Sequence, residues 1–371
     1  FDDKISFEES KTLAKTIDYY LWEWFLDEDG KDLSKLESCS IGSALVGSVD
    51  ILLNTQFRYE LGLKKILKKN SKLYYFSNCE QIFKITIPTI CSKLNIENIE
   101  LNKVNKKKTF SYGRLKINVS DTIGRYRDLA AIFRKNPLKD FALNLFLNKP
   151  VIQEKKKILY VQSGKLETFF SDIKLDPNIS KNIVLYRSPK NMFDILFNNM
   201  KGNNFYFFSP CRNVNTYDIN EIVTNLKHNI LKRFKKFEYS ISLKLMENYI
   251  FPHFFHIFSF YKDVRYKLSI INPNLVILSA DNHEYHILIA QAAKALKIKT
   301  AEIPHGMYNG GYSNLKVGNF KVFDFFFCFG DAGKKILRSL GVPEKNIRIS
   351  SFPYFEKFMP IKKINKKNYT N

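Results

Sequence analysis

Apolar residues between positions 272 and 353 come in short unbroken runs, separated by longer stretches with helical character. The first run, 274–280, shows no alternation of apolar and polar residues, which is typical of a strand buried on both faces of a parallel sheet. An alanine-rich stretch follows it, and a second helix is predicted to end at Leu340, because Gly341 stands where helices commonly stop. The strands predicted in this part of the chain cover residues 274–280, 299–303, 322–329 and 346–350. This pattern predicts an α/β fold with a parallel sheet.

The pattern also predicts two units along the chain. Residues 148–157 form a polar, charged connector, and the run 158–162 after it begins a new sheet, to which strands at 183–186 and 205–208 are added. Before the connector, helices are predicted over 10–25, 43–69 and 80–94 and around 121–147, with strands over 72–76 and 96–101. We therefore predict an accessory α/β unit over residues 1–150 and a Rossmann-like domain over 157–356. Residues 357–371 form a tail or the start of a linker.

Polar residues follow the predicted strands. In open parallel sheets, ligands bind beyond the carboxyl ends of the strands. In this chain those ends carry Asp281, His283, His305 and Asp331. Chemistry is therefore expected along that edge of the sheet.

Two residues are the main catalytic candidates. Asp281 has a carboxylate that suits a general base or a nucleophile at a sugar carbon, although Asp281 and Glu284 also have the spacing of a helix capping box. His305 precedes Gly306, which permits close approach of a ligand, and its imidazole suits proton transfer or a phosphate contact. The alternative for His305 is a histidine hydrogen-bonded within its loop.

Further candidates are weaker. Glu302 is predicted to be either a paired structural carboxylate or a second catalytic acid, and Glu167 is a possible base. The aromatic residues near Tyr308 suit stacking on sugar rings, or belong to a plain hairpin loop. The predicted substrate-binding residues are Ser163, Gly164, Lys165, Asn282, His283, Gly306, Tyr308, Asn309 and Asp331.

Metal and disulfide chemistry find little support in the sequence. His283 and His286 share a helix face, but they do not match a zinc-protease motif. The five cysteines are widely spaced and odd in number, which argues against a disulfide scaffold or a structural zinc site and fits a reducing cytoplasm. We expect neither a metal nor a cofactor.

The formal net charge of +23 limits the class of partners. It reflects either compositional drift toward Lys or a basic surface for anionic lipids, nucleotide phosphates or acidic glycans. Nucleic acid is not favoured, because the aromatic residues lie in apolar runs and are not interleaved with basic ones. The run 249–256 is core or a membrane-facing patch, and no apolar run is long enough to span a bilayer. We expect a cytoplasmic protein, with peripheral association with the inner face of an anionic membrane.

The segment 272–353 carries a family resemblance. Its residues are Pro304-His305-Gly306, Asp324, Gly330-Asp331, Leu340-Gly341-Val342 and Pro353. The pattern resembles the end of the N-terminal domain in GT-B glycosyltransferases and related enzymes, including Kdo transferases, CDP-glycerol phosphotransferases and UDP-N-acetylglucosamine 2-epimerases. It covers roughly a quarter of the chain.

The resemblance implies a GT-B-type N-terminal domain of a protein that builds bacterial surface polysaccharide. Such a protein moves a sugar from a nucleotide-activated donor to a glycan or lipid-linked acceptor, typically without a metal. In the resembled families a nucleotide-binding domain would follow residue 371, so the expected role is the acceptor-side portion of a transferase. The alternatives are a nucleotide-sugar epimerase and a non-catalytic sugar- or lipid-binding subunit that lacks the donor domain.

Overall fold

The computed structural model describes part of the chain. The described residues are 5–66, 72–76, 81–101, 109–112, 115–118, 158–161, 183–186, 205–206, 215–234, 241–278, 284–304 and 322–350. Their contacts divide the chain into two compact units, one built from 1–19, 50–150 and 230–252 and the other from 20–49, 151–229 and 253–371.

The second unit contains a parallel sheet of seven described strands in the order β13-β12-β11-β10-β7-β8-β9. The strands are β7 (Ile158–Val161), β8 (Ile183–Tyr186), β9 (Phe205–Tyr206), β10 (Leu275–Leu278), β11 (Lys299–Glu302), β12 (Phe325–Phe329) and β13 (Ile347–Ser350). The chain runs outward from β7 to β9, returns to the other side of β7, and then continues outward from β10 to β13. This order is that of doubly wound nucleotide-binding folds, with one strand added. The predicted Rossmann-like α/β fold is confirmed.

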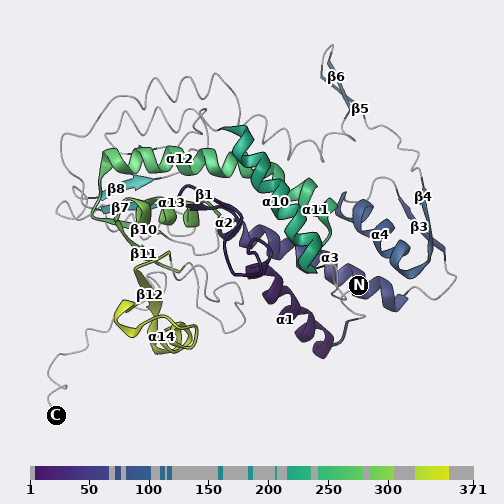
Figure 1. The fold of residues 1–371 in the computed structure, drawn as a ribbon, viewed down its shortest axis with the longest axis horizontal. Helices are drawn as coiled ribbons and strands as arrows, with labels where there is room; N and C mark the ends of the chain where they lie inside the picture. Colours follow the sequence, from purple (N-terminus) through teal and green to yellow (C-terminus); the bar gives the residue numbers. More distant parts are fainter. Residues whose placement is uncertain are drawn as a thin grey trace. The chain divides into compact units, whose positions relative to one another are not determined.

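Helices α13 (Glu284–Ala295) and α14 (Gly330–Ser339) pack against this sheet, and α12 (Phe254–Ile271) packs against α13. Helix α13 contacts β10, β11 and α12, and α14 contacts β12 and β13 (Figure 1). Every residue of α13 from His286 to Ala293 is buried, as expected for a helix that is apolar around most of its circumference. Its alanines let neighbouring elements approach closely.

An N-terminal segment, residues 20–49, belongs to the same unit as the sheet. It contains the hairpin β1 (Lys35–Leu36) and β2 (Cys39–Ser40), followed by α2 (Ile41–Ala44). Both β2 and α2 contact α13. The buried amide of Gln291 accepts a hydrogen bond from the Ser40 backbone N–H (2.8 Å) and donates one to its carbonyl (3.2 Å). The contacts therefore group residues 20–49 with the sheet. The predicted domain limits, 1–150 and 157–356, remain a prediction.

The other unit holds a small parallel pair and several helices. Its elements include most of α1 (Phe7–Glu23) and α3 (Val46–Ile66), with β3 (Lys72–Phe76), α4 (Gln81–Leu94), β4 (Glu97–Leu101), β5 (Thr109–Tyr112), β6 (Leu115–Asn118) and α11 (Leu243–Tyr249). Helix α1 begins with a capping box, in which Ser6 and Glu9 exchange hydrogen bonds. A hydrogen bond from Lys65, together with those from Ser6, lowers the pKa of Glu9 to about 2.

The predicted strands of the sheet are present, with small shifts at their ends. Helix α3 confirms most of the helix predicted over 43–69, although a separate short helix, α2, ends at Ala44 before α3 begins at Val46. Helices α10 (Thr216–Phe234) and α12 were not predicted, and the region 121–147 lies outside the described residues. No described helix is long and apolar enough to cross a membrane.

Candidate functional site

The strand ends on both sides of the topological switch point are level with one another. Leu278, the last residue of β10, pairs with Val161 of β7 on one side and with Glu302 of β11 on the other. The switch point lies between β7 and β10, because the chain builds outward from this pair in both directions. In folds of this kind, the crevice beyond these carboxyl ends is where ligands bind. The candidate site is therefore built from the residues that end β7, β10 and β11 and begin the helices next to them.

Glu302 places a carboxylate at the end of a central strand. Glu302 is fully buried, with 0% exposure. It follows Thr300 and Ala301, which are also buried. Removing an ionised carboxylate from water is costly unless it is paired, so a buried glutamate at a strand end needs a reason. Both alternatives for Glu302, a paired structural group and a catalytic acid, are compatible with this position.

The first turn of α13 lies at the same edge, since this helix follows β10. Glu284 begins the helix, where a negative charge is favoured by the helix dipole. Its Oε2 accepts a hydrogen bond from the Ser48 hydroxyl at 3.4 Å. Ser48 stands near the start of α3 and is part of the sheet unit. The N-terminal segment thus contributes a side chain to the candidate site.

Next to Glu284, a histidine and a tyrosine share a hydrogen bond. His256 Nε2 lies 3.2 Å from the Tyr285 hydroxyl, and their rings meet edge to face at 6.2 Å. Phe260 packs on Tyr285 with ring centroids 4.8 Å apart, which fixes the phenol ring. Histidine is the side chain best suited to exchange protons near neutral pH, and a phenol can relay them. Neither residue was among the site residues predicted from the sequence.

Of the residues predicted from sequence, Glu302 and Asp331 fall within the described residues. Asp331 is exposed in the first turn of α14, directly after β12, so it too lies at the carboxyl edge. The others lie outside the described residues: Ser163, Gly164, Lys165, Glu167, Asp281, Asn282, His283, His305, Gly306, Tyr308 and Asn309. Their roles remain predictions. The parallel pairing of β10 with β11, from which the shared edge was predicted, is confirmed.

His286, predicted to share a helix face with His283, is buried within α13 at 6% exposure. Among the described residues, no group of three or more His, Cys, Asp or Glu side chains is arranged to hold a metal ion.

Asp324, one of the residues of the family resemblance, has a structural role at the opposite edge of the sheet. It precedes β12 and accepts hydrogen bonds from the backbone N–H and hydroxyl of Thr300 at 3.0 and 3.3 Å and from Lys299 Nζ at 3.0 Å. Burial raises the pKa of this carboxyl, but the hydrogen bonds and charge of Lys299 and the hydrogen bonds of Thr300 outweigh it and hold the pKa below its usual value. Asp324 therefore fastens the start of β12 to the start of β11.

Comparison with known proteins gives distant structural similarity. No family model and no curated protein matches this chain. Among solved structures, a UDP-N-acetylglucosamine 2-epimerase from Rickettsia bellii is similar with a TM-score of 0.31 and 15% identity, over 56% of this chain and 48% of that one. A second UDP-N-acetylglucosamine 2-epimerase gives 0.30 and 14%, over 53% and 46%. This chain thus spans about half the length of the structures it matches, and likeness at this level does not assign an activity.

Proposed function

We propose that this protein binds a nucleotide-activated sugar at the carboxyl edge of its sheet and takes part in transferring that sugar to a glycan or lipid-linked acceptor during synthesis of bacterial surface polysaccharide. The observation that carries the proposal is the strand order, whose switch point between β7 and β10 is bordered by groups able to exchange protons. The family resemblance of residues 272–353 supplies the class of substrate.

Each part of this edge has a chemical use in such a reaction. The first turn of α13 offers backbone N–H groups and a positive dipole end to a phosphate of the donor. Asp281, predicted to lie just before that helix, would act as base or nucleophile, and His305 would assist the phosphate or the acceptor. Glu302 and the His256–Tyr285 pair would hold or move the proton that leaves the acceptor hydroxyl.

A nucleotide-sugar epimerase is the second candidate. An epimerase removes a proton from a sugar carbon and returns one to the other face, and a histidine–tyrosine pair next to a buried carboxylate suits that chemistry as well. The two functions differ in one requirement, since a transferase consumes its donor only when an acceptor is present. A sugar- or lipid-binding subunit would bind the donor or acceptor without consuming either.

The test begins with binding. Melting temperature and ligand-observed NMR are measured with free nucleotides and with UDP-, CDP- and CMP-linked sugars, using wild type, Tyr285→Phe and, as a distant control, Glu344→Gln. We expect binding of one nucleotide series by wild type and by the control. Donor consumption with and without a lipid-linked acceptor then separates transferase from epimerase. Absence of binding across all three series would overturn the proposal.

A further inference from the structure

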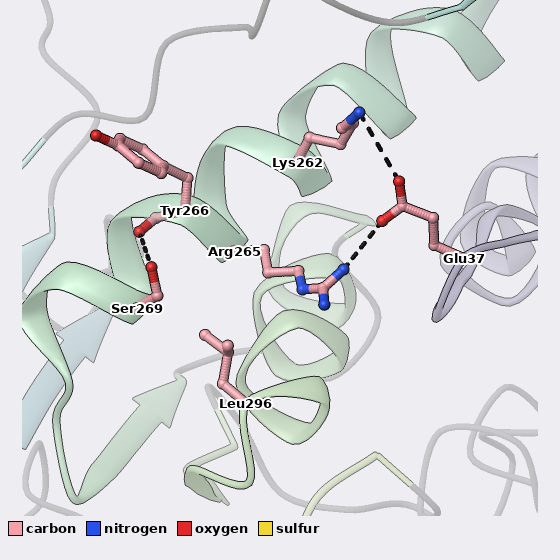
Figure 2. Close-up of a pocket in the computed structure, with 6 residues that line it drawn as sticks. All are labelled: Glu37, Lys262, Arg265, Tyr266, Ser269 and Leu296. Atoms are coloured by element: carbon pink, nitrogen blue, oxygen red, sulfur yellow. Dashed lines mark hydrogen bonds and ion pairs between the residues drawn. The ribbon is translucent and has the colours of Figure 1, made fainter.

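A hollow of about 330 Å³ lies away from the candidate site, between the ends of α12 and α13 (Figure 2). It is lined by Glu37, Lys262, Arg265, Tyr266, Ser269 and Leu296. Ser269 is close to the end of α12, which leads into β10, and Leu296 follows α13 shortly before β11. Both helices run toward the amino edge of the sheet at this point, so the hollow is separate from the carboxyl edge.

Two cations and one carboxylate meet at this hollow. Arg265 donates a hydrogen bond to Glu37 at 2.9 Å, and Lys262 Nζ lies 3.8 Å from the other oxygen of the same carboxylate (Figure 2). The three side chains are 34–42% exposed, so water screens these contacts and the attraction is weak. The cluster keeps a formal charge of +1 while Glu37 is in place.

The backbone of Glu37 is fixed independently of its carboxylate. Glu37 and Ser38 form the turn of the β1–β2 hairpin, and Glu37 has a left-handed backbone with φ of 53°. The Ser38 hydroxyl lies 2.6 Å from the Tyr261 hydroxyl of α12, which holds the turn beside that helix. The carboxylate can therefore leave the two cations without displacing the hairpin.

We propose that this hollow binds a phosphate group, which replaces the Glu37 carboxylate on Lys262 and Arg265. The planar fork of Arg and the point charge of Lys are the side chains that commonly bind phosphate, and a phosphate carries up to twice the negative charge of a carboxylate. Leu296, which also lines the hollow, provides apolar surface for the remainder of the molecule (Figure 2). The phosphate belongs to a soluble phosphomonoester or to the headgroup of an anionic lipid. This inference does not depend on the proposed catalytic function.

The chain offers a matched control with the same three kinds of charged side chain, Lys, Arg and Glu. On α14, Lys334 lies 2.6 Å and Arg338 3.5 Å from Glu344, and none of these residues lines the hollow. Glu344→Gln therefore changes a Lys–Arg–Glu cluster of equal charge without touching the proposed site. Any effect of Glu37→Gln that Glu344→Gln shares is due to net charge alone.

The experiment measures binding of inorganic phosphate and glycerol phosphate by NMR titration of wild type, Glu37→Gln, Glu344→Gln and the double variant Lys262→Ala/Arg265→Ala. Glu37→Gln removes the internal competitor, so we expect it to tighten binding by about 3- to 10-fold. Glu344→Gln should bind as wild type does, and the double variant should bind at least about tenfold more weakly. Because Glu37→Gln preserves the size of the side chain, the test does not depend on the double variant folding normally.

A second arm distinguishes the source of the phosphate. The same four proteins are floated with vesicles of phosphatidylcholine, with and without phosphatidic acid, at about 0.15 M salt. Soluble phosphate binding with the expected order of variants supports a soluble ligand, and vesicle binding alone with that order supports a lipid headgroup. The inference is overturned if Glu37→Gln and Glu344→Gln behave alike in both arms, or if neither arm shows binding.

Discussion

The two edges of the parallel sheet use polar residues in different ways. At the carboxyl edge, the described contacts join groups that can exchange a proton, His256 with Tyr285 and Ser48 with Glu284. At the amino edge, carboxylates are matched with cations, as in the contact of Asp324 with Lys299. Charge pairing at the amino edge thus holds strands and helices in place. The carboxyl edge instead places groups that can exchange protons beside the switch point. A mutation should therefore have a different consequence at each edge.

The largest expected effect comes from Glu302→Gln at the carboxyl edge. If Glu302 holds or moves a proton, donor turnover should fall by about 10²–10⁴-fold while the melting temperature changes little, because the amide has nearly the same shape. Turnover is measured as kcat/KM on purified protein, with the melt recorded on the same sample.

Thr300→Val is the matched control for that variant. Thr300 is buried on the same face of β11, two residues earlier, and its hydroxyl donates to the Val322 carbonyl at 3.0 Å. It should lose stability and keep its specific activity. If Glu302→Gln behaves in the same way as Thr300→Val, then Glu302 is a structural group.

A smaller loss is expected for Tyr285→Phe, by about 10- to 100-fold in kcat/KM if the hydroxyl relays a proton. The ring and its packing on Phe260 are retained, so the fold should be unaffected. His256→Gln should cause a similar loss, and the double variant should be no worse than either single variant, because the two residues act as one unit. Losses that multiply in the double variant, or an unchanged pH–rate profile in both singles, would show that the pair only packs.

At the amino edge, Asp324→Asn should lower the free energy of unfolding by about 1–2 kcal/mol without affecting turnover. The expected loss of stability is small because the Asp324 side chain is 35% exposed and water screens its interactions. Urea unfolding at neutral pH gives this number, and a loss of turnover at unchanged stability would contradict a structural role.

The same variant predicts a pH dependence. The folded pKa of Asp324 is lowered, so its contribution is complete above the unfolded pKa of about 3.9 and is lost as the pH falls through the folded value. The difference in stability between wild type and Asp324→Asn should therefore be constant near neutral pH and should shrink in acid, below about pH 4. A difference that grows on acidification would refute this assignment.

The smallest effect is expected for Glu344→Gln. Hydrogen bonding and charge from Lys334, with the charge of Arg338, lower the pKa of Glu344, but the Glu344 side chain is 55% exposed and water screens these contacts. We expect no measurable change in melting temperature or turnover, at low or high salt. A clear destabilisation that disappears at high salt would show that exposed ion pairs at this edge contribute measurably to stability, contrary to this expectation.

The fold was largely predictable because strands β7, β8, β10 and β12 are apolar runs bounded by polar residues. β8 begins and ends where predicted, whereas β12 begins at Phe325, three residues later than predicted. Helix α12 was missed although its buried residues Phe254, Ile257, Tyr261, Val264 and Leu268 recur at helical spacing. Helix α10 also carried such a signal, in buried Ile219, Ile222, Leu226 and Ile230 at helical spacing.

The site was less predictable, for a physical reason. Strand ends can be located from sequence, and this placed Glu302 among the candidates. His256 and Tyr285 are 29 positions apart and meet only because α12 packs against α13. Pairings of this kind are set by tertiary packing, and the spacing of residues along the sequence does not predict them.

The hydrogen bonds between Ser40 and Gln291 also have a consequence for the order in which the protein folds. They join positions 251 residues apart, so at about 5–20 residues per second the hairpin is synthesised roughly 10–50 s before its partner. During that interval Ile41 and Leu45, which are fully buried in the folded chain, have no α13 to cover them. Contacts this distant also slow folding, because the chain must close a long loop before they form. We expect a slow refolding phase that ends when the hairpin docks, with the newly made N-terminal segment dependent on chaperones until then.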